Sequence, residues 1–289
     1  MAIYREASVP PSFTSWSYRN TRWAGLRNQV GYKLIDWISQ PAWQIINDYR
    51  QQWKLPTVSR LDETFSPLAQ LSQQPAAFDF PRTTLPACFH YVGPLRHPSP
   101  QPVPFPFEQL TGQPLVYASL GTIQNTRQDI FQTIADACTG LDIQLVISHG
   151  GGLSLKDVQG LPGSPVVVPY APQYELLSQA VLTITHAGMN TVLDSLSHGV
   201  PLIAIPIAHE QPAIAARIRW TQTGEVVPLR QLTTPQLRSM VQRVLQHDSY
   251  RAAALRVKES ILLAGGVKTA DIVEQAIVTR QPVLTHSLC

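Results

Sequence analysis

The residues after position 113 alternate between short β-type runs and helical segments, and this alternation limits the folds that the chain can adopt. Repeated β-α units predict a mostly parallel sheet covered by helices on both faces, which is an α/β doubly wound, Rossmann-like domain. Such sheets bind ligands at the carboxyl ends of their strands, so the strand-to-helix turns are where we expect the chemistry. The predicted strands are 114–120, 143–148, 166–168, 181–185, 201–205 and 225–228, and the predicted helices are 126–140, 188–198, 211–222, 235–247, 249–263 and 269–279.

A proline-rich stretch divides the chain in two. Six of the thirteen residues from Pro94 to Pro106 are proline, a density that sustains neither a helix nor a central strand. We therefore predict a semi-rigid linker at 96–106. It separates a partial, mostly helical N-terminal α/β domain at 1–95 from a complete Rossmann-like domain at 107–289.

The opening segment is basic and rich in tryptophan. Residues 1–60 carry a net charge of +5 and five of the six tryptophans. Apolar residues at helical spacing predict a helix from about Arg22 to Trp53, which Pro41 breaks or kinks near its middle. One interpretation is a surface for a membrane interface or an apolar substrate. We favour the other, in which a helix pair packs against protein and its basic residues face solvent.

Composition excludes several classes of protein. The chain of 289 residues has 14% charged residues and a formal charge of +3, which argues against a dedicated nucleic-acid binder. Its longest apolar stretch, Val200 to Ala208, is too short to span a membrane. Cys88, Cys138 and Cys289 lack CxxC spacing, so neither a disulfide framework nor a zinc site is indicated. With no signal peptide recognisable after Met1, we expect a cytoplasmic protein.

One strand-to-helix turn carries the most chemical information. In Thr183-Ile-Thr-His186-Ala-Gly188-Met-Asn190-Thr191, small residues let the backbone approach a ligand closely. The start of the following helix presents unpaired N–H groups, which suit an anion. His186, Asn190 and Thr191 add side-chain hydrogen-bonding groups. The turn therefore predicts a diphosphate site.

The neighbours of this turn stand in a fixed register with it. Upstream lies Tyr170-Ala-Pro-Gln173, and downstream follow Asp194, then Gly199-Val-Pro201, then the pair Glu210-Gln211. Together they resemble the donor-binding motif of the UDP-sugar glycosyltransferases. Within that family, the opening segment and the Ile205–Ile218 stretch look closest to bacterial carotenoid, zeaxanthin-type glucosyltransferases. The strand from Leu115 to Thr122 and the segment Tyr91-Val-Gly-Pro-Leu95 are also similar to that family. The resemblance implies a GT-B-like fold.

Carried over position by position, the resemblance implies three groups of donor-binding residues. Tyr170 would stack on uracil, with Gln173 beside the base and ribose, and Asp194 would accept hydrogen bonds from the ribose hydroxyls. Glu210 and Gln211 would bind hydroxyls of the sugar. The diphosphate would be held by residues of two glycine-containing turns, which are Gly121, Thr122, His186, Gly188, Asn190 and Thr191.

The resemblance also implies the reaction and its partners. A hexose, most simply glucose, would pass from a UDP-sugar to a hydroxyl of a small lipophilic acceptor such as a carotenoid, with inversion and without a metal or other cofactor. The family's general base is a histidine near the start of its N-terminal domain, but the first histidine of this chain is His90, next to the domain exit. No catalytic residue can therefore be assigned. The alternative is a non-catalytic or split donor-binding subunit that needs a separate N-terminal half.

Overall fold

The computed structural model describes residues 4–95, 103–264 and 268–285. A six-stranded sheet forms its larger part, with strand order β5-β4-β3-β6-β7-β8 and every neighbouring pair parallel. The register runs through the sheet without a break except at Leu115/Val116, where β3 shifts against β6. The strands are β3 (Leu115–Ser119), β4 (Gln144–Ser148), β5 (Val166–Val168), β6 (Ala180–Thr185), β7 (Leu202–Ala204) and β8 (Gly224–Val226).

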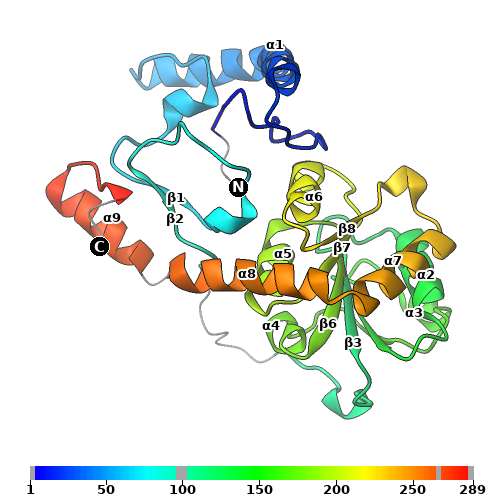
Figure 1. Cartoon of the computed structure of the whole chain (residues 1–289). Coiled ribbons are helices and arrows are strands. Elements are labelled where there is room, and N and C mark those ends of the chain that lie inside the picture. The colour runs from blue at the N-terminus through cyan, green and yellow to red at the C-terminus, as the bar shows by residue number, and fades with distance from the viewer. Residues whose placement is uncertain (1–3, 96–102, 265–267, 286–289) are drawn as a thin grey trace.

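Helices cover both faces of this sheet, because successive strand residues point to opposite sides (Figure 1). Val116 and Ala118 pack with residues of α2 and α7 in one buried cluster, whereas the alternate residues Leu115 and Tyr117 pack with α4. A third cluster joins α5, α6 and α8 to Leu202. These helices are α2 (Gln128–Cys138), α3 (Leu155–Gln159), α4 (Gln173–Leu177), α5 (Met189–Ser197), α6 (Gln211–Trp220), α7 (Thr234–Gln246) and α8 (Asp248–Ala264).

The predicted α/β doubly wound class is confirmed, and each predicted strand and helix after residue 113 has a counterpart within a few residues. The two short helices α3 and α4 have no counterpart in the prediction. Each is five residues long, so neither shows the repeated apolar spacing by which a helix is recognised.

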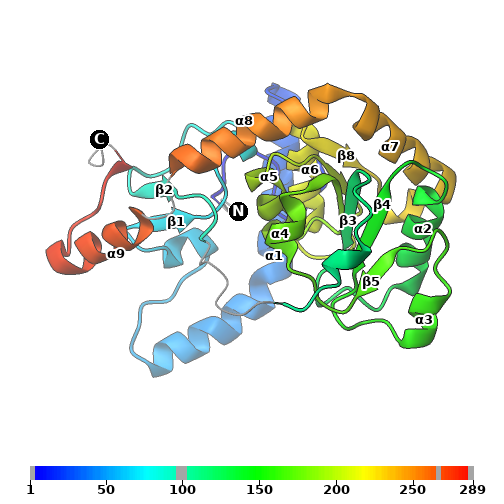
Figure 2. The ribbon, with the colours of Figure 1, turned by 90° about the horizontal axis from the view of Figure 1, so that it is seen from below.

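The N-terminal part contains a second, small sheet that the sequence did not predict. Strands β1 (Gln70–Ser72) and β2 (Phe89–Tyr91) pair in parallel, and the last helix, α9 (Lys268–Thr279), packs beside them through Ile272 and Ala276. Figures 1 and 2 show α8 running from the large sheet towards this pair. The predicted linker falls mostly on residues outside the described ones. Short 3₁₀ turns occur at Leu61–Thr64, Ala76–Phe78, Phe107–Gln109 and Leu229–Gln231.

Helix α1 (Arg22–Gln52) is one continuous helix of 31 residues that contains Pro41 and bends near its middle, as Figures 1 and 2 show. The predicted kink is therefore confirmed, and the helix is not broken into a separate pair. Its N-cap residue is Thr21, whose hydroxyl accepts from the Ala24 amide. Its buried residues are small or polar, namely Ala24, Asn28 and Gly31.

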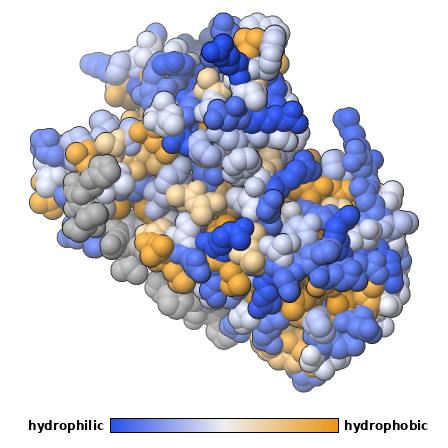
Figure 3. All heavy atoms as spheres, viewed as in Figure 1, coloured by the Kyte–Doolittle hydropathy of each residue, from blue (hydrophilic) through white to orange (hydrophobic). Residues whose placement is uncertain are grey.

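Helix α1 also carries a row of large apolar residues along both of its halves that solvent reaches. The preference for packing against protein is therefore wrong for these residues. Figure 3 shows part of that surface, with apolar side chains among hydrophilic ones over α1. We call this set the α1 stripe, and it consists of Trp23, Leu26, Val30, Leu34, Trp37, Ile38, Ile45, Ile46 and Tyr49.

Candidate donor-sugar site

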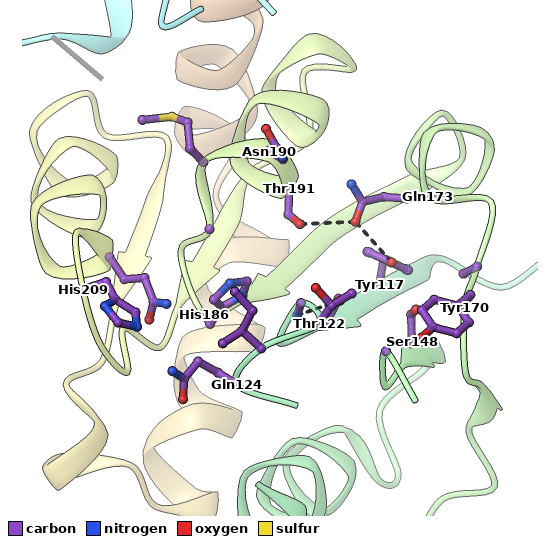
Figure 4. A pocket seen from close by; sticks show the side chains of 18 of the residues that line it. Tyr117, Thr122, Gln124, Ser148, Tyr170, Gln173, His186, Asn190, Thr191 and His209 are labelled. Carbon is purple, nitrogen blue, oxygen red and sulfur yellow. Dashed lines mark hydrogen bonds between the residues drawn. The ribbon is translucent and has the colours of Figure 1, made fainter. Parts of the chain in front are cut away.

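A cavity of about 720 Å³ lies at the carboxyl ends of β3, β4 and β6, where the crossover from one half of the sheet to the other leaves a crevice (Figure 4). It gathers ten of the eleven residues singled out from the sequence: Gly121, Thr122, Tyr170, Gln173, His186, Gly188, Asn190, Thr191, Glu210 and Gln211. Asp194 is the one that does not line it.

The turn after β6 places the start of α5 at the cavity wall. Thr185 ends the strand, Ala187 adopts a left-handed φ of 67°, and Gly188 is the N-cap residue with no side-chain cap for the helix. The N-cap residue therefore supplies no side-chain acceptor to the start of α5, where the helix dipole adds partial positive charge. This end of α5 is suited to an anionic group.

The imidazole of His186 is held between two glycines. A Cβ atom at Gly188 would lie 2.6 Å from the ring atoms Cε1 and Nε2, and one at Gly121 would lie 2.8 Å from Cε1. Burial lowers the pKa of His186, although a carbonyl of Ser119 and the charge of Glu210 act in the other direction. The ring is therefore neutral at pH 7 and can donate one hydrogen bond or accept one.

Gln173 is the centre of a hydrogen-bond cluster on the opposite wall. Its Oε1 accepts from the hydroxyls of Tyr117 and Thr191, each at 3.3 Å (Figure 4). Its Nε2 donates to Oδ2 of Asp194 at 2.6 Å. Gln173 is thereby fixed by three elements, β3, α4 and α5.

Asp194 lies directly behind the cavity wall. Only 6% of the surface of Asp194 is exposed, and its Oδ2 atom accepts the hydrogen bond from Gln173. Asp194 therefore orients Gln173 from behind the wall, and its direct contact with a ribose stays a prediction.

Glu210 and Gln211 lie where the chain turns from β7 into α6. His209 before them has a φ of 55°, a left-handed conformation that is unfavourable for a non-glycine residue, and it also lines the cavity. Oε1 of Gln211 accepts from the amides of Ile207 and Ala208 at 2.8 and 2.9 Å. Gln211 thus fixes its own loop with one end of its amide and keeps only the NH₂ end for a ligand.

Tyr170 remains open to solvent, as a stacking platform must be, with 56% of its surface exposed. A Cβ atom at Gly151 would approach its hydroxyl to 3.1 Å, so the glycine run at 150–152 passes beside the ring. That run also contacts the loop after β3, because Nδ2 of Asn125 donates to the Gly150 carbonyl at 2.6 Å and a Cβ at Gly152 would meet Asn125 O at 2.2 Å.

Sequence reasoning missed several lining residues, namely Tyr117, Ser119, Ile123, Gln124, Ser148, Gly150, Ala171, Met189 and His209. The signal for the loop at 150–152 was present in its three consecutive glycines, which permit the close backbone approach just described. His209 had no such signal, because its left-handed φ cannot be read from residue type.

His90 is a structural residue and not a base at this site. It is buried in β2, and its Nε2 lies 2.9 Å from the carbonyl of Val283. Within the described residues, no group of three or more His, Cys, Asp or Glu is placed to hold a metal ion. Nor does any described helix combine the length and apolarity needed to cross a membrane.

Comparison with known proteins agrees with this geometry. The family model of UDP-glucoronosyl and UDP-glucosyl transferases matches residues 57–262, which include every residue of the cavity wall. The chain belongs to this family.

Individual relatives show which members of the family this chain is similar to. A zeaxanthin glucosyltransferase of Pantoea ananas is 36% identical over 291 residues, covering 99% of this chain and 67% of the relative. One from Pseudescherichia vulneris is also 36% identical, covering 98% and 68%. The solved calicheamicin glycosyltransferase CalG4 matches with a TM-score of 0.69 at 25% identity, covering 83% of this chain and 61% of that one. The chain is thus a glycosyltransferase of GT-B fold that spans about two thirds of the length of these relatives.

Proposed function

We propose that this glycosyltransferase takes a hexose, glucose foremost, from a UDP-sugar and transfers it to the hydroxyl of a small lipophilic acceptor such as a carotenoid. The observation that carries the proposal is the position of His186, Gly188 and Asn190 around the start of α5, inside one cavity with Tyr170 and Glu210. A diphosphate, a flat base and a polar sugar each have a matching wall there.

Each wall suits one portion of the donor. The exposed ring of Tyr170 stacks on uracil, and Gln173, held by Asp194, donates or accepts beside the ribose. The N-terminus of α5 and the neutral His186 bind the diphosphate together with Thr122. Glu210 accepts hydrogen bonds from sugar hydroxyls, and the free NH₂ of Gln211 donates one.

The proposed class of acceptor is supported by the relatives and by the N-terminal part of the chain. Two relatives named zeaxanthin glucosyltransferase match nearly all of this chain, which supports a carotenoid alcohol. The α1 stripe provides exposed aromatic and aliphatic surface beyond the donor cavity, which is compatible with an apolar molecule or the lipid layer that carries it.

The chemistry we propose is inversion by direct displacement. A base removes the proton of the acceptor hydroxyl while its oxygen attacks the anomeric carbon in line, and the bond to the diphosphate oxygen breaks. Negative charge then grows on UDP, where the amides of α5 and its dipole stabilise it. These groups let the reaction proceed without a metal in our proposal. No described residue is assigned as the base.

Calorimetric titration with UDP and UDP-glucose tests the donor half of the proposal. We expect both to bind, and His186→Ala to weaken binding by about 1–3 kcal/mol because a buried polar contact to the diphosphate is lost. An unchanged affinity in a folded His186→Ala protein would place the donor elsewhere. Product formation from UDP-glucose and a carotenoid alcohol then tests transfer.

A second candidate is a donor-binding protein that needs a separate chain to catalyse transfer. The α1 stripe favours it, because a stripe of large apolar residues is normally covered in a folded assembly. Under this alternative the purified 289-residue chain binds UDP-glucose but forms no product. Product appears only when a second polypeptide supplies a histidine that acts as the general base. Robust turnover by the chain alone would reject it.

A further inference from the structure

A buried ionic cluster joins the N-terminal part to helix α6. Arg217, only 1% exposed, donates from Nε and Nη2 to Oδ1 of Asp79 at 3.0 and 2.8 Å across 138 positions of sequence. Oδ2 of Asp79 accepts from Nε of Arg82 at 2.8 Å and from the hydroxyl of Tyr91 at 2.9 Å. The guanidinium of Arg217 also lies 4.4 Å from the ring centre of Phe80.

Burying such a cluster costs desolvation free energy that apolar packing of a helix does not. Removing two charged groups from water costs several kcal/mol for each, and packed apolar residues of the same volume are often at least as stabilising. Although burial alone would raise the pKa of Asp79, the two arginines outweigh it and lower that pKa, so the carboxylate stays charged. The cluster therefore calls for an explanation other than net stability.

The other contacts between α6 and the N-terminal part are apolar. Ile214 and Ile218 pack in the core beside the sheet, whereas Ala216 packs with Val9 and Phe80. Apolar contacts have no preferred direction. Arg217 adds a directional contact, because its head group is held by Asp79 and its Nη1 donates to the carbonyl of Ala213 in the same helix at 3.2 Å.

The first turn of α6 is also the wall of the donor cavity. Arg217 stands six residues, about 9 Å along the axis, beyond Gln211. His209, just before the helix, keeps its left-handed φ only while β7 and α6 fix the loop from both ends. A change in the position of α6 is therefore passed directly to Glu210 and Gln211.

We propose that Asp79 and Arg217 are positioning residues, which clamp α6 to the N-terminal part and so hold Glu210 and Gln211 at the sugar end of the donor. Their effect is on recognition of the hexose and not of UDP. The contacts proposed for UDP come from the turns after β3 and β6 and from the segment around Tyr170, which the clamp does not touch. This inference rests on the function proposed above.

Titration with UDP and with UDP-glucose separates this role from a merely structural one. In Asp79→Asn we expect the affinity for UDP to stay within about twofold and that for UDP-glucose to fall about five- to tenfold. Tyr91→Phe removes one hydrogen bond to Asp79 and keeps both arginine pairs, so it serves if Asp79→Asn does not fold, with an expected loss of about two- to threefold for UDP-glucose alone. Asp129→Asn, which breaks an exposed pair with Arg127, is the matched control and should change neither affinity.

Hydrogen exchange gives a second readout that does not need a donor. Amides from 206 to 212 should exchange faster in Asp79→Asn, whereas those from 183 to 191 should keep their rates. The clamp proposal would be overturned if the folded variants lost equal affinity for UDP and UDP-glucose. It would also be overturned if the amide exchange rates at 206–212 were unchanged. If the wild-type protein binds no UDP, the proposed donor function fails, and the exchange rates alone still decide whether α6 is clamped.

Discussion

Replacing Gly188 by alanine tests the arrangement of the anion-binding turn with a single methyl group. Gly188 has φ −65° and ψ 132°, which alanine adopts without backbone strain. Any effect must then come from the new Cβ, which would lie 2.6 Å from two atoms of the His186 ring. On its other side the ring faces Gly121, where even an added Cβ would lie 2.8 Å from Cε1, so there is little room to move in that direction.

The expected magnitude has two parts. Forcing a methyl group into a filled site costs about 1–3 kcal/mol, which lowers the melting temperature by roughly 2–10 °C for a chain of this size. Displacing His186 and covering the first amides of α5 removes hydrogen bonds to a charged ligand, each worth about 1.5–3 kcal/mol, so UDP affinity should fall about 10- to 100-fold.

Thermal melting and calorimetric titration with UDP measure both parts. Gly160→Ala is the control, because a Cβ there meets nothing closer than the Lys156 carbonyl at 4.0 Å and the site is distant. A Gly188→Ala protein that binds UDP like the wild type would refute the reasoning. It would mean either that the ring moves freely or that the anion lies elsewhere.

Three further predictions concern the cavity wall and the ionic cluster. Asp194→Ala and Gln173→Ala should each weaken UDP binding by about 1–3 kcal/mol, with the double variant no weaker than either, because Asp194 acts through Gln173; additive losses in titration would contradict this. Asp79 has a lowered pKa, so its contribution is present above the ordinary carboxyl value near 4 and is lost as the pH falls below it. The melting temperature of Asp79→Asn should therefore lie well below that of the wild type at pH 7, and the difference should shrink as the pH falls through the lowered pKa of Asp79. UDP-glucuronate should compete more weakly than UDP-glucose because Glu210 repels its carboxylate, and a preference for the glucuronate would reject that role.

The large sheet could be predicted from the sequence because its signals are local. Each strand from Leu115 to Val226 is a short run of apolar residues, and each crossover helix fills the interval to the next. Parallel order then follows from chain geometry, and it brings the turns after β3 and β6 to one edge. Most of the cavity wall was predictable for the same reason, since residues that follow neighbouring parallel strands must meet.

What could not be predicted depends on contacts between distant segments. Asp194 carries the right chemistry for a ribose, yet in the structure its Oδ2 accepts from Gln173, which comes from another helix. The strands of the β1–β2 pair, Gln-Leu-Ser and Phe-His-Tyr, are not runs of apolar residues like those of the large sheet, and they are joined by pairing across a gap of sequence. The pairing of Asp79 with Arg217 joins residues 138 positions apart, and neither has a local pattern that marks it as buried.

Helix α1 shows most clearly where periodicity stops being informative. Its apolar spacing correctly predicts a helix with one apolar side, but it does not say which side the protein covers. Where α1 packs closely on the protein its residues are small or polar, so Gly31 lies against Trp16, with a contact of 2.8 Å for a hypothetical Cβ. The large apolar residues that the spacing assigns to the core are therefore exposed. The donor cavity is assembled from strand ends, so it does not depend on which part of α1 is covered.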